Sequence, residues 1–273
     1  MELEILDYSI YGNTCDQDSD RLLAVAAQRE RLSVCVTKLT RDVPITLAAP
    51  CIWLRYDLRT WDELRWIVDL AETFQETGMR VFPKARSLQI SEDKWETYQA
   101  LSRAGVSTVT TFPVSQVQHC GAKAVIKPRV GWGGMKMRVV TDTRRFDLDQ
   151  DEAQDHFICQ PYIAHEQTWT IAAAAGIILA CIEKSPGSGD FRTNELHGGT
   201  TCPALLPGGA ASLTLTALEV VDLTAGTVDL IMGEHGLEVL EVNSAPGLYY
   251  PSIPDLDLAG PMVRAVLAWM GQP

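Results

Sequence analysis

The arrangement of apolar runs changes once along this chain of 273 residues, and this change limits the folds that it can adopt. Up to about residue 85, short apolar runs alternate with segments in which apolar residues recur at helical spacing. The expected strands are residues 3–6, 32–36, 48–54 and 80–82, and the expected helices are residues 19–31 and 60–77. This alternation predicts a small α/β unit with a parallel sheet and crossover helices.

After Pro83 the pattern consists mostly of strands with few helices. Ser91 precedes two acidic residues and predicts the N-cap of a helix that runs to Arg103 and ends at Gly105. Further strands are expected at residues 108–112, 124–127, 137–140, 157–162, 168–174, 177–183, 227–231 and 237–242, and further helices at 212–223 and 258–270. Runs of strands with fewer helices predict an antiparallel α+β architecture for this part.

The composition argues against several classes of partner. A net charge of −12 disfavours binding to nucleic acid or to an anionic membrane, because both need a basic surface. The sequence contains no run of 18 apolar residues, so we expect no membrane span. The acidic N-terminus does not resemble a signal peptide. The 7 Cys are odd in number and form no CxxC pair, so we expect free thiols in a cytoplasmic protein.

One group of candidate functional residues lies in the stretch AVIKPRVGWGGMK. A strand ends in Lys127, and the glycines that follow open a turn before the next strand. These glycines are Gly131, Gly133 and Gly134. Glycine lets backbone amides approach phosphate oxygens closely, and lysine supplies a positive charge. The segment by itself fits an ordinary glycine-rich hairpin equally well.

A second group lies in the stretch GDFRTNELHGG. Arg192 and Asn194 are residue types that bind a phosphate or a developing oxyanion. Taken alone this group is weak, because Gly-Asp and Gly-Gly pairs are common in loops.

A third group lies on two neighbouring strands near the C-terminus. Strand alternation places Glu241 and Asn243 on one face, and Asp229 on the preceding strand can lie beside them. Two carboxylates and an amide oxygen suit Mg²⁺ rather than Zn²⁺. The alternative is a solvated hairpin face, which the apolar flanking residues disfavour.

Five segments, in this order, resemble the ATP-grasp superfamily and its RimK-like branch of amino-acid ligases. The resemblance extends from about Arg80 to Ala268. Its segments are EDKWETYQALSRAGVSTVTTF, AVIKPRVGWGG, GDFRTNELHGGT, EVLEVNSAPGL and DLDLAGPMV. Val109 stands where the branch usually has proline. The resemblance implies an ATP-grasp fold preceded by a small Rossmann-like domain. The domains expected are residues 1–85 (pre-ATP-grasp), 86–160 (small lid subdomain) and 161–273 (C-terminal subdomain).

The resemblance also implies roles for individual residues. Lys94 and Lys127 would contact the phosphates of ATP, and residues 131–134 would form a lid over them. Gln160, Tyr162 and Ile163 would form the hinge strand that reads adenine. Asp229, Glu241 and Asn243 would bind Mg²⁺, with two ions expected and Mn²⁺ as an alternative. The catalytic residues would be Arg192, Lys127 and Asn194.

The chain departs from the family pattern after the hinge. The branch usually carries an acidic residue followed at the second position by Arg, and here the stretch is EQTWT, without Arg. Glu166 is the candidate for the ribose hydroxyls, and Lys184 is the candidate to replace the missing Arg. The resemblance does not tell what contact the absent guanidinium made.

The implied reaction is the ATP-dependent joining of a carboxylate to an amine through an acyl phosphate, with ADP and phosphate released. The substrates would be small molecules such as amino acids, peptides or carrier-bound metabolites, whose identity the sequence leaves open. An intramolecular version that forms a ring and a non-catalytic ATP-binding regulator are the alternatives, and a homo-oligomer is compatible with the family. In the N-terminal part, we expect Trp53, Trp61 and Trp66 to pack in the core. We expect Arg55 either to bind a substrate carboxylate or to form a surface salt bridge.

Overall fold

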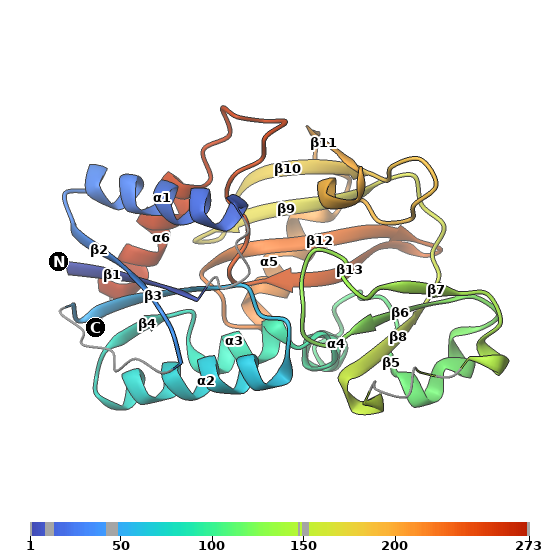
Figure 1. The fold of residues 1–273 in the computed structure, drawn as a ribbon. Coiled ribbons are helices and arrows are strands. Elements are labelled where there is room, and N and C mark those ends of the chain that lie inside the picture. The colour runs from blue at the N-terminus through green and yellow to red at the C-terminus, as the bar shows by residue number, and fades with distance from the viewer. Residues whose placement is uncertain (1, 9–13, 42–48, 147, 149–152, 272–273) are drawn as a thin grey trace.

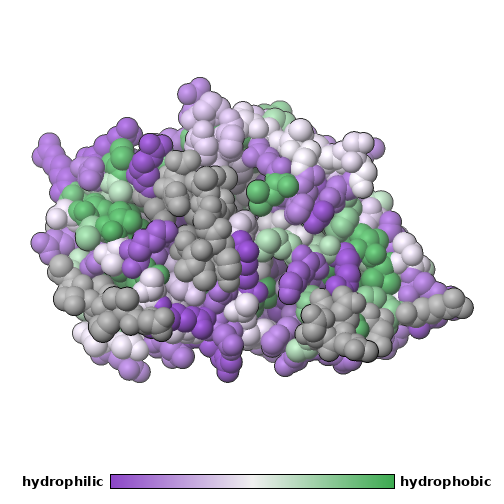
Figure 2. All heavy atoms as spheres, viewed as in Figure 1, coloured by the Kyte–Doolittle hydropathy of each residue, from purple (hydrophilic) through white to green (hydrophobic). Residues whose placement is uncertain are grey.

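The computed structural model describes residues 2–8, 14–41, 49–146, 148 and 153–271. The strands of these residues form three β-sheets, and the two ends of the chain lie on the same side of the molecule (Figure 1). No helix in these ranges has the length and apolar character needed to cross a bilayer. In the view of Figure 2, apolar residues form separate patches among hydrophilic ones.

The N-terminal sheet is parallel throughout, as predicted, with strand order β2-β1-β3-β4. Its strands are β1 (Glu2–Tyr8), β2 (Ser33–Lys38), β3 (Cys51–Tyr56) and β4 (Arg80–Phe82). Helices α1 (Thr14–Arg29) and α6 (Ala259–Gly271) lie on one face and α2 (Trp61–Glu76) on the other (Figure 1). Because both faces are covered, all six residues of β3 are buried.

Helix α2 begins at a capping box, in which the Thr60 side chain accepts from the Glu63 backbone and Glu63 accepts from the Thr60 backbone. The three tryptophans of this region serve packing, as expected. Trp53 is buried, Trp66 packs 4.7 Å from the ring of Tyr8, and the ring of Trp61 lies 4.5 Å from the Arg129 guanidinium.

Two helices, rather than one, connect the first sheet to the second. They are α3 (Ala85–Glu92) and α4 (Lys94–Arg103), and Asp93 between them has an extended backbone that ends the first helix and precedes the second. The prediction that Ser91 is the N-cap is therefore wrong: Ser91 lies inside α3, and the Asp93 carboxylate accepts from the Trp95 backbone at the start of α4.

The second sheet is antiparallel, in the order β5-β8-β6-β7. Its strands are β5 (Phe112–Pro113), β6 (Ala124–Pro128), β7 (Arg138–Val140) and β8 (Phe157–Pro161). Three 3₁₀ helices accompany it, at Val114–Cys120, Thr143–Arg145 and Gln154–His156. The strand expected at 108–112 is reduced to β5 and to a single bridge between Thr108 and Val239.

The third sheet is also antiparallel, in the order β11-β10-β9-β12-β13. Its strands are β9 (Thr168–Ala174), β10 (Ile177–Ser185), β11 (Thr200–Pro203), β12 (Ala225–Gly233) and β13 (Gly236–Asn243). A short 3₁₀ helix (Glu195–His197) and helix α5 (Ala210–Val220) complete this part. The predicted antiparallel α+β architecture is confirmed, although β11 was not anticipated. The predicted domain limits at residues 85 and 160 stay a prediction.

Candidate active site

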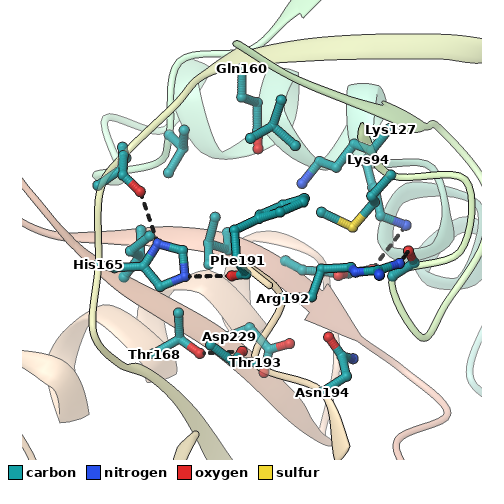
Figure 3. Close-up of a pocket in the computed structure, with 18 of the residues that line it drawn as sticks. Lys94, Lys127, Gln160, His165, Thr168, Phe191, Arg192, Thr193, Asn194 and Asp229 are labelled. Atoms are coloured by element: carbon teal, nitrogen blue, oxygen red, sulfur yellow. Dashed lines mark hydrogen bonds and ion pairs between the residues drawn. The ribbon is translucent and has the colours of Figure 1, made fainter. Parts of the chain in front are cut away.

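The main cavity lies between the second and third sheets and is open to solvent, with a volume of about 1020 Å³. One wall comes from α4, β6, the glycine loop and β8, and the opposite wall comes from β12, β13 and the loop after β10. Figure 3 shows Lys127 and Gln160 entering from the first wall and Asp229 and Asn194 from the second. A molecule held here would touch both sheets at once.

Two carboxylates meet on the third sheet. Asp229 of β12 and Glu241 of β13 are direct cross-strand partners, as the sequence predicted, and Thr170 of β9 donates to Asp229. The register shifts immediately after this pair, and Leu240 and Glu241 consequently both line the cavity.

Three lysines surround this carboxylate pair. The Lys94 ammonium lies 3.0 Å from Glu241, and that of Lys184 lies 3.8 Å from Asp229. Lys127 is 4 % exposed, and burial lowers the pKa of its ammonium to about 8. Burial alone would raise the pKa of Glu241, but the charges of the three lysines outweigh it and lower that pKa. The site therefore brings three ammonium groups close to two carboxylates.

The glycine loop contacts the loop that carries Arg192. Lys94 donates to the Gly131 carbonyl at 2.5 Å, and Arg192 donates to the Gly134 carbonyl at 3.3 Å. Gly134 has a φ of +72°, and a Cβ there would lie 3.1 Å from Arg192 Cδ. Glycine is required at this close approach. The Asp190 carboxylate accepts from Arg192 Nε and Nη2 and holds the guanidinium in place.

The strand β8 leads into the other end of the cavity. The Gln160 side chain donates to Thr111 Oγ1 at 2.9 Å, and the Tyr162 backbone N–H donates to the Lys123 carbonyl at 3.0 Å. His165 lies between the carbonyls of Ile163 (2.8 Å) and Phe191 (3.0 Å) and links the end of β8 to the Arg192 loop (Figure 3).

Most of the residues predicted from the sequence line this cavity. They are Lys94, Lys127, Gly131, Gly133, Gly134, Gln160, Tyr162, Ile163, Lys184, Arg192, Asn194, Asp229 and Glu241. Glu166 is exposed on the loop after β8 and does not line it. His165 and Trp132 also line the cavity but were not predicted from the sequence, although Trp132 lies within the glycine loop and His165 follows the predicted hinge.

A second cavity of about 870 Å³ adjoins the first on the side of the N-terminal sheet. Asn243 lines this cavity rather than the first. Six residues line both: Trp132, Gly133, Lys184, Asn194, Asp229 and Glu241. The carboxylate pair thus stands at the boundary between the two spaces.

The donor set at this boundary fits Mg²⁺. Asp229, Glu241 and Asn243 offer only oxygen ligands, and Mg²⁺ completes its octahedron with water and phosphate oxygens. In the described ranges, no group of three or more His, Cys, Asp or Glu side chains is arranged to hold a metal. Two carboxylates and one amide oxygen would leave the other coordination positions of a Mg²⁺ ion to water or to a bound ligand.

Arg55, by contrast, is buried at 2 % exposure within β3 and lines neither cavity. The expectation of a surface salt bridge is wrong, because the Arg55 side chain is buried. The expectation that Arg55 binds a substrate carboxylate stays a prediction.

Comparison with known proteins supports a single family. A family model described as RimK-like ATP-grasp domain matches residues 91–266, which is more than half of the chain. The ribosomal protein bS6–L-glutamate ligase of Escherichia coli is 27% identical over 273 residues, covering 89% of each chain.

Two solved structures illustrate the fold. A D-cycloserine synthetase superposes with a TM-score of 0.76 at 16% identity, covering 98% of this chain and 99% of the other. The D-alanine–D-alanine ligase of Bacillus anthracis, complexed with ATP, gives a TM-score of 0.69 at 13% identity, with 99% of each chain covered. At these identities the two structures establish the fold alone. The family match over residues 91–266 shows that the chain belongs to the RimK-like ATP-grasp family, and the two structures agree with it in fold.

Proposed function

We propose that this chain joins a carboxylate to an amine at the expense of ATP, through an acyl phosphate, and releases ADP and phosphate. The observation that carries the proposal is the Asp229–Glu241 pair surrounded by Lys94, Lys127 and Lys184 between two sheets. Paired carboxylates and clustered lysines are suited to gather a triphosphate with its metal ions. Two of the three proteins compared above, the glutamate ligase and the D-alanine–D-alanine ligase, are ligases by name, which agrees with this reaction.

The nucleotide would lie in the main cavity. Its adenine would contact the end of β8, where the Tyr162 N–H is already used by the Lys123 carbonyl. We therefore assign adenine recognition to the backbone of Ile163 and to the side chain of Gln160, both of which line the cavity. Lys94 and Lys127 would bind the phosphates, with Lys94 also holding the glycine loop through the Gly131 carbonyl. Asp229, Glu241 and Asn243 would hold two Mg²⁺ ions, or Mn²⁺ in their place.

The chemistry depends on charge neutralisation and on the exclusion of water. A bound Mg²⁺ supplies a charge that polarises the phosphoryl oxygens. Arg192 and Asn194 would stabilise the acyl phosphate and the oxyanion that forms when the amine attacks. The glycine loop, which already contacts Arg192 and His197, would cover the reacting groups and keep water from the intermediate.

The test is the release of ADP from Mg-ATP across a panel of amino acids and dipeptides, with product masses measured. The double variant Asp229→Asn/Glu241→Gln should lose at least a hundredfold in rate. Glu238→Gln, on the same strand but outside both cavities, is the matched control and should retain activity. Formation of AMP and pyrophosphate would contradict the proposal. A product that is one substrate less water would instead indicate ring closure.

A further inference from the structure

The glycine loop between β6 and β7 is held in place by a residue outside both cavities. His197 Nε2 lies 2.9 Å from the Gly133 carbonyl, and a carbonyl only accepts, so the imidazole donates. Two further contacts to carbonyls of this loop come from Lys94 and Arg192, which line the main cavity. His197 lines neither cavity and is therefore placed to act on the loop rather than on a ligand.

The loop packs closely against the segment that carries His197. Gly133 and Gly134 have φ values of +67° and +72°. A Cβ on Gly133 would lie 3.2 Å from Leu196 Cδ1, and a Cβ on Gly134 would lie 3.4 Å from His197 Nε2. Any other residue at these two positions would be strained in its backbone and would crowd this segment. The two glycines therefore permit the loop to close onto the 3₁₀ helix Glu195–His197.

This 3₁₀ helix is itself anchored to the third sheet and to the segment after β13. The Glu195 carboxylate accepts from Thr201 Oγ1 in β11 and, at 2.8 Å, from Ser252 Oγ in the segment after β13. The His197 backbone N–H donates to the Asn194 carbonyl at 2.9 Å. His197 therefore connects a fixed point beside the third sheet to a loop of the second sheet, and the main cavity lies between these sheets.

The contact between His197 and Gly133 does not require a charged imidazole. The neutral tautomer with its proton on Nε2 and the imidazolium can both donate to the carbonyl. Glutamine offers an amide N–H at a similar distance from the backbone, whereas alanine offers no donor. Glutamine and alanine at this position therefore differ mainly in whether the hydrogen bond is kept.

The position of the glycine loop bears on both cavities, because Trp132 and Gly133 line both. With ATP in the main cavity, as proposed above, the adjoining cavity is left for the substrates, and the loop covers the boundary between them. An amine that attacks the acyl phosphate at its carbonyl carbon forms the C–N bond, loses a proton and releases phosphate. Water that attacks the same carbon returns the carboxylate and releases phosphate, so that ATP is consumed without product.

We propose that His197 is a positioning residue whose hydrogen bond to Gly133 keeps the glycine loop closed, and that the closed loop directs the acyl phosphate to the amine instead of to water. The closing of the loop is independent of the reaction. Its effect on the acyl phosphate rests on the proposed function.

The first test uses trypsin on the free protein. Lys136 is exposed two residues after the glycine loop, and mass spectrometry measures cleavage behind it. Cleavage reports the population of the opened segment when opening and closing are fast relative to cleavage. His197→Ala should be cut about fivefold faster than wild type, the effect of one lost hydrogen bond, and His197→Gln at close to the wild-type rate. His235→Ala, at the exposed turn between β12 and β13, is the matched control.

A second variant removes the anchor and leaves the imidazole in place. Glu195→Ala should also raise the rate of cleavage behind Lys136. The double variant Glu195→Ala/His197→Ala should be cut at most about twice as fast as His197→Ala, because both changes act on the same contact. Circular dichroism establishes that each variant folds, and Glu195→Ala decides the matter where His197→Ala does not fold.

The second test counts ADP released for each molecule of condensed product, with any active substrate pair. Wild type and His197→Gln should give a ratio close to unity. His197→Ala should release about three ADP or more for each product, because water enters beneath the opened loop. KM for ATP should change by less than about threefold, since the lysines that would bind the phosphates remain.

The outcomes separate this inference from the proposed function. Unchanged cleavage in His197→Ala, or equal acceleration in His197→Gln, overturns the inference whatever the protein makes. Faster cleavage with an unchanged ratio of ADP to product overturns the effect on the acyl phosphate. Faster cleavage in His197→Ala, when wild type forms no product from any pair, supports the role of His197 in closing the loop and contradicts the proposed reaction.

Discussion

Lys127 is the residue whose chemistry depends most directly on its burial. It lies at the end of β6, inside the main cavity, and burial lowers the pKa of its ammonium to about 8. A bound triphosphate would raise that pKa again, because it places negative charge beside the ammonium. The free protein therefore has the lower pKa and the nucleotide complex the higher one.

This difference predicts proton uptake on nucleotide binding. Below pH 7 the lysine is charged in both states, and affinity for ATP should not depend on it. As the pH rises through 8, the free protein loses the proton that the complex retains, so affinity should fall. Calorimetry at pH 8.5 in buffers of different ionisation enthalpy should register uptake of a fraction of a proton. Lys127→Arg, which stays charged, should remove most of this uptake; an identical uptake in the variant would contradict the assignment.

Asp190 is predicted to act through Arg192. Its carboxylate accepts from Arg192 Nε, Nη2 and the backbone N–H, and the pKa of Asp190 is lowered well below its usual range by these bonds. Asp190→Ala should lower kcat about tenfold or more, because a misplaced group near the reacting atoms loses much of its effect. KM for ATP should change little. Steady-state kinetics check this, and an unchanged kcat would show that Arg192 does not need Asp190.

At the scale of elements, the junction between α3 and α4 connects the N-terminal sheet to the second sheet. Asp93 is 1 % exposed in its side chain, caps α4 and receives two hydrogen bonds from Arg129, which follows β6. The Asp93 carboxylate therefore links the first turn of α4 to the end of β6.

Asp93→Ala should lower the free energy of unfolding by about 3 kcal/mol, since it removes a buried partner of a charged group and a helix cap. Asp93→Asn keeps an oxygen for the cap but loses the charge, and should cost less. Urea unfolding followed by circular dichroism measures both. Equal stability of all three proteins would show that the junction contributes little.

The same junction illustrates where sequence patterns fail. Strands such as β3 and β9 were predictable because each contains a short apolar run, and all of their residues are buried. Ser91 and Asp93 are both good N-caps, and the pattern did not distinguish them. The choice is made by Arg129, which lies 36 residues further along the chain and draws Asp93 into the ion pair.

Some residues of the candidate site could likewise be predicted from the sequence, and others could not. Asp229 and Glu241 were predicted as neighbours because two adjacent strands separated by a short turn must pair. Asp57 and Glu92 were not predicted, since their place in the second cavity depends on how the N-terminal sheet meets the third sheet. His165 was missed because its partners are backbone carbonyls, which leave no mark on the sequence.

At the scale of the whole molecule, a nucleotide would contact two sheets simultaneously. Binding only to the folded state should stabilise the protein by about 2.7 kcal/mol at a ligand concentration 100 times Kd. Thermal unfolding with a non-hydrolysable ATP analogue, with and without Mg²⁺, measures this. The double variant Asp229→Asn/Glu241→Gln should lose the part that depends on Mg²⁺. A shift that is the same in both proteins would place the metal elsewhere.

The boundary shared by the two cavities has a consequence for how such an enzyme can diversify. The residues that line the main cavity come mainly from the second and third sheets, whereas Asp57, Leu58 and Glu92, which line the second cavity, follow β3 and end α3. Mutations in the latter group can alter what is accepted without disturbing how ATP is used. Libraries restricted to residues 56–58 and 92 and to the turn at 245–250 would therefore vary the second cavity and leave the residues proposed to bind ATP unchanged.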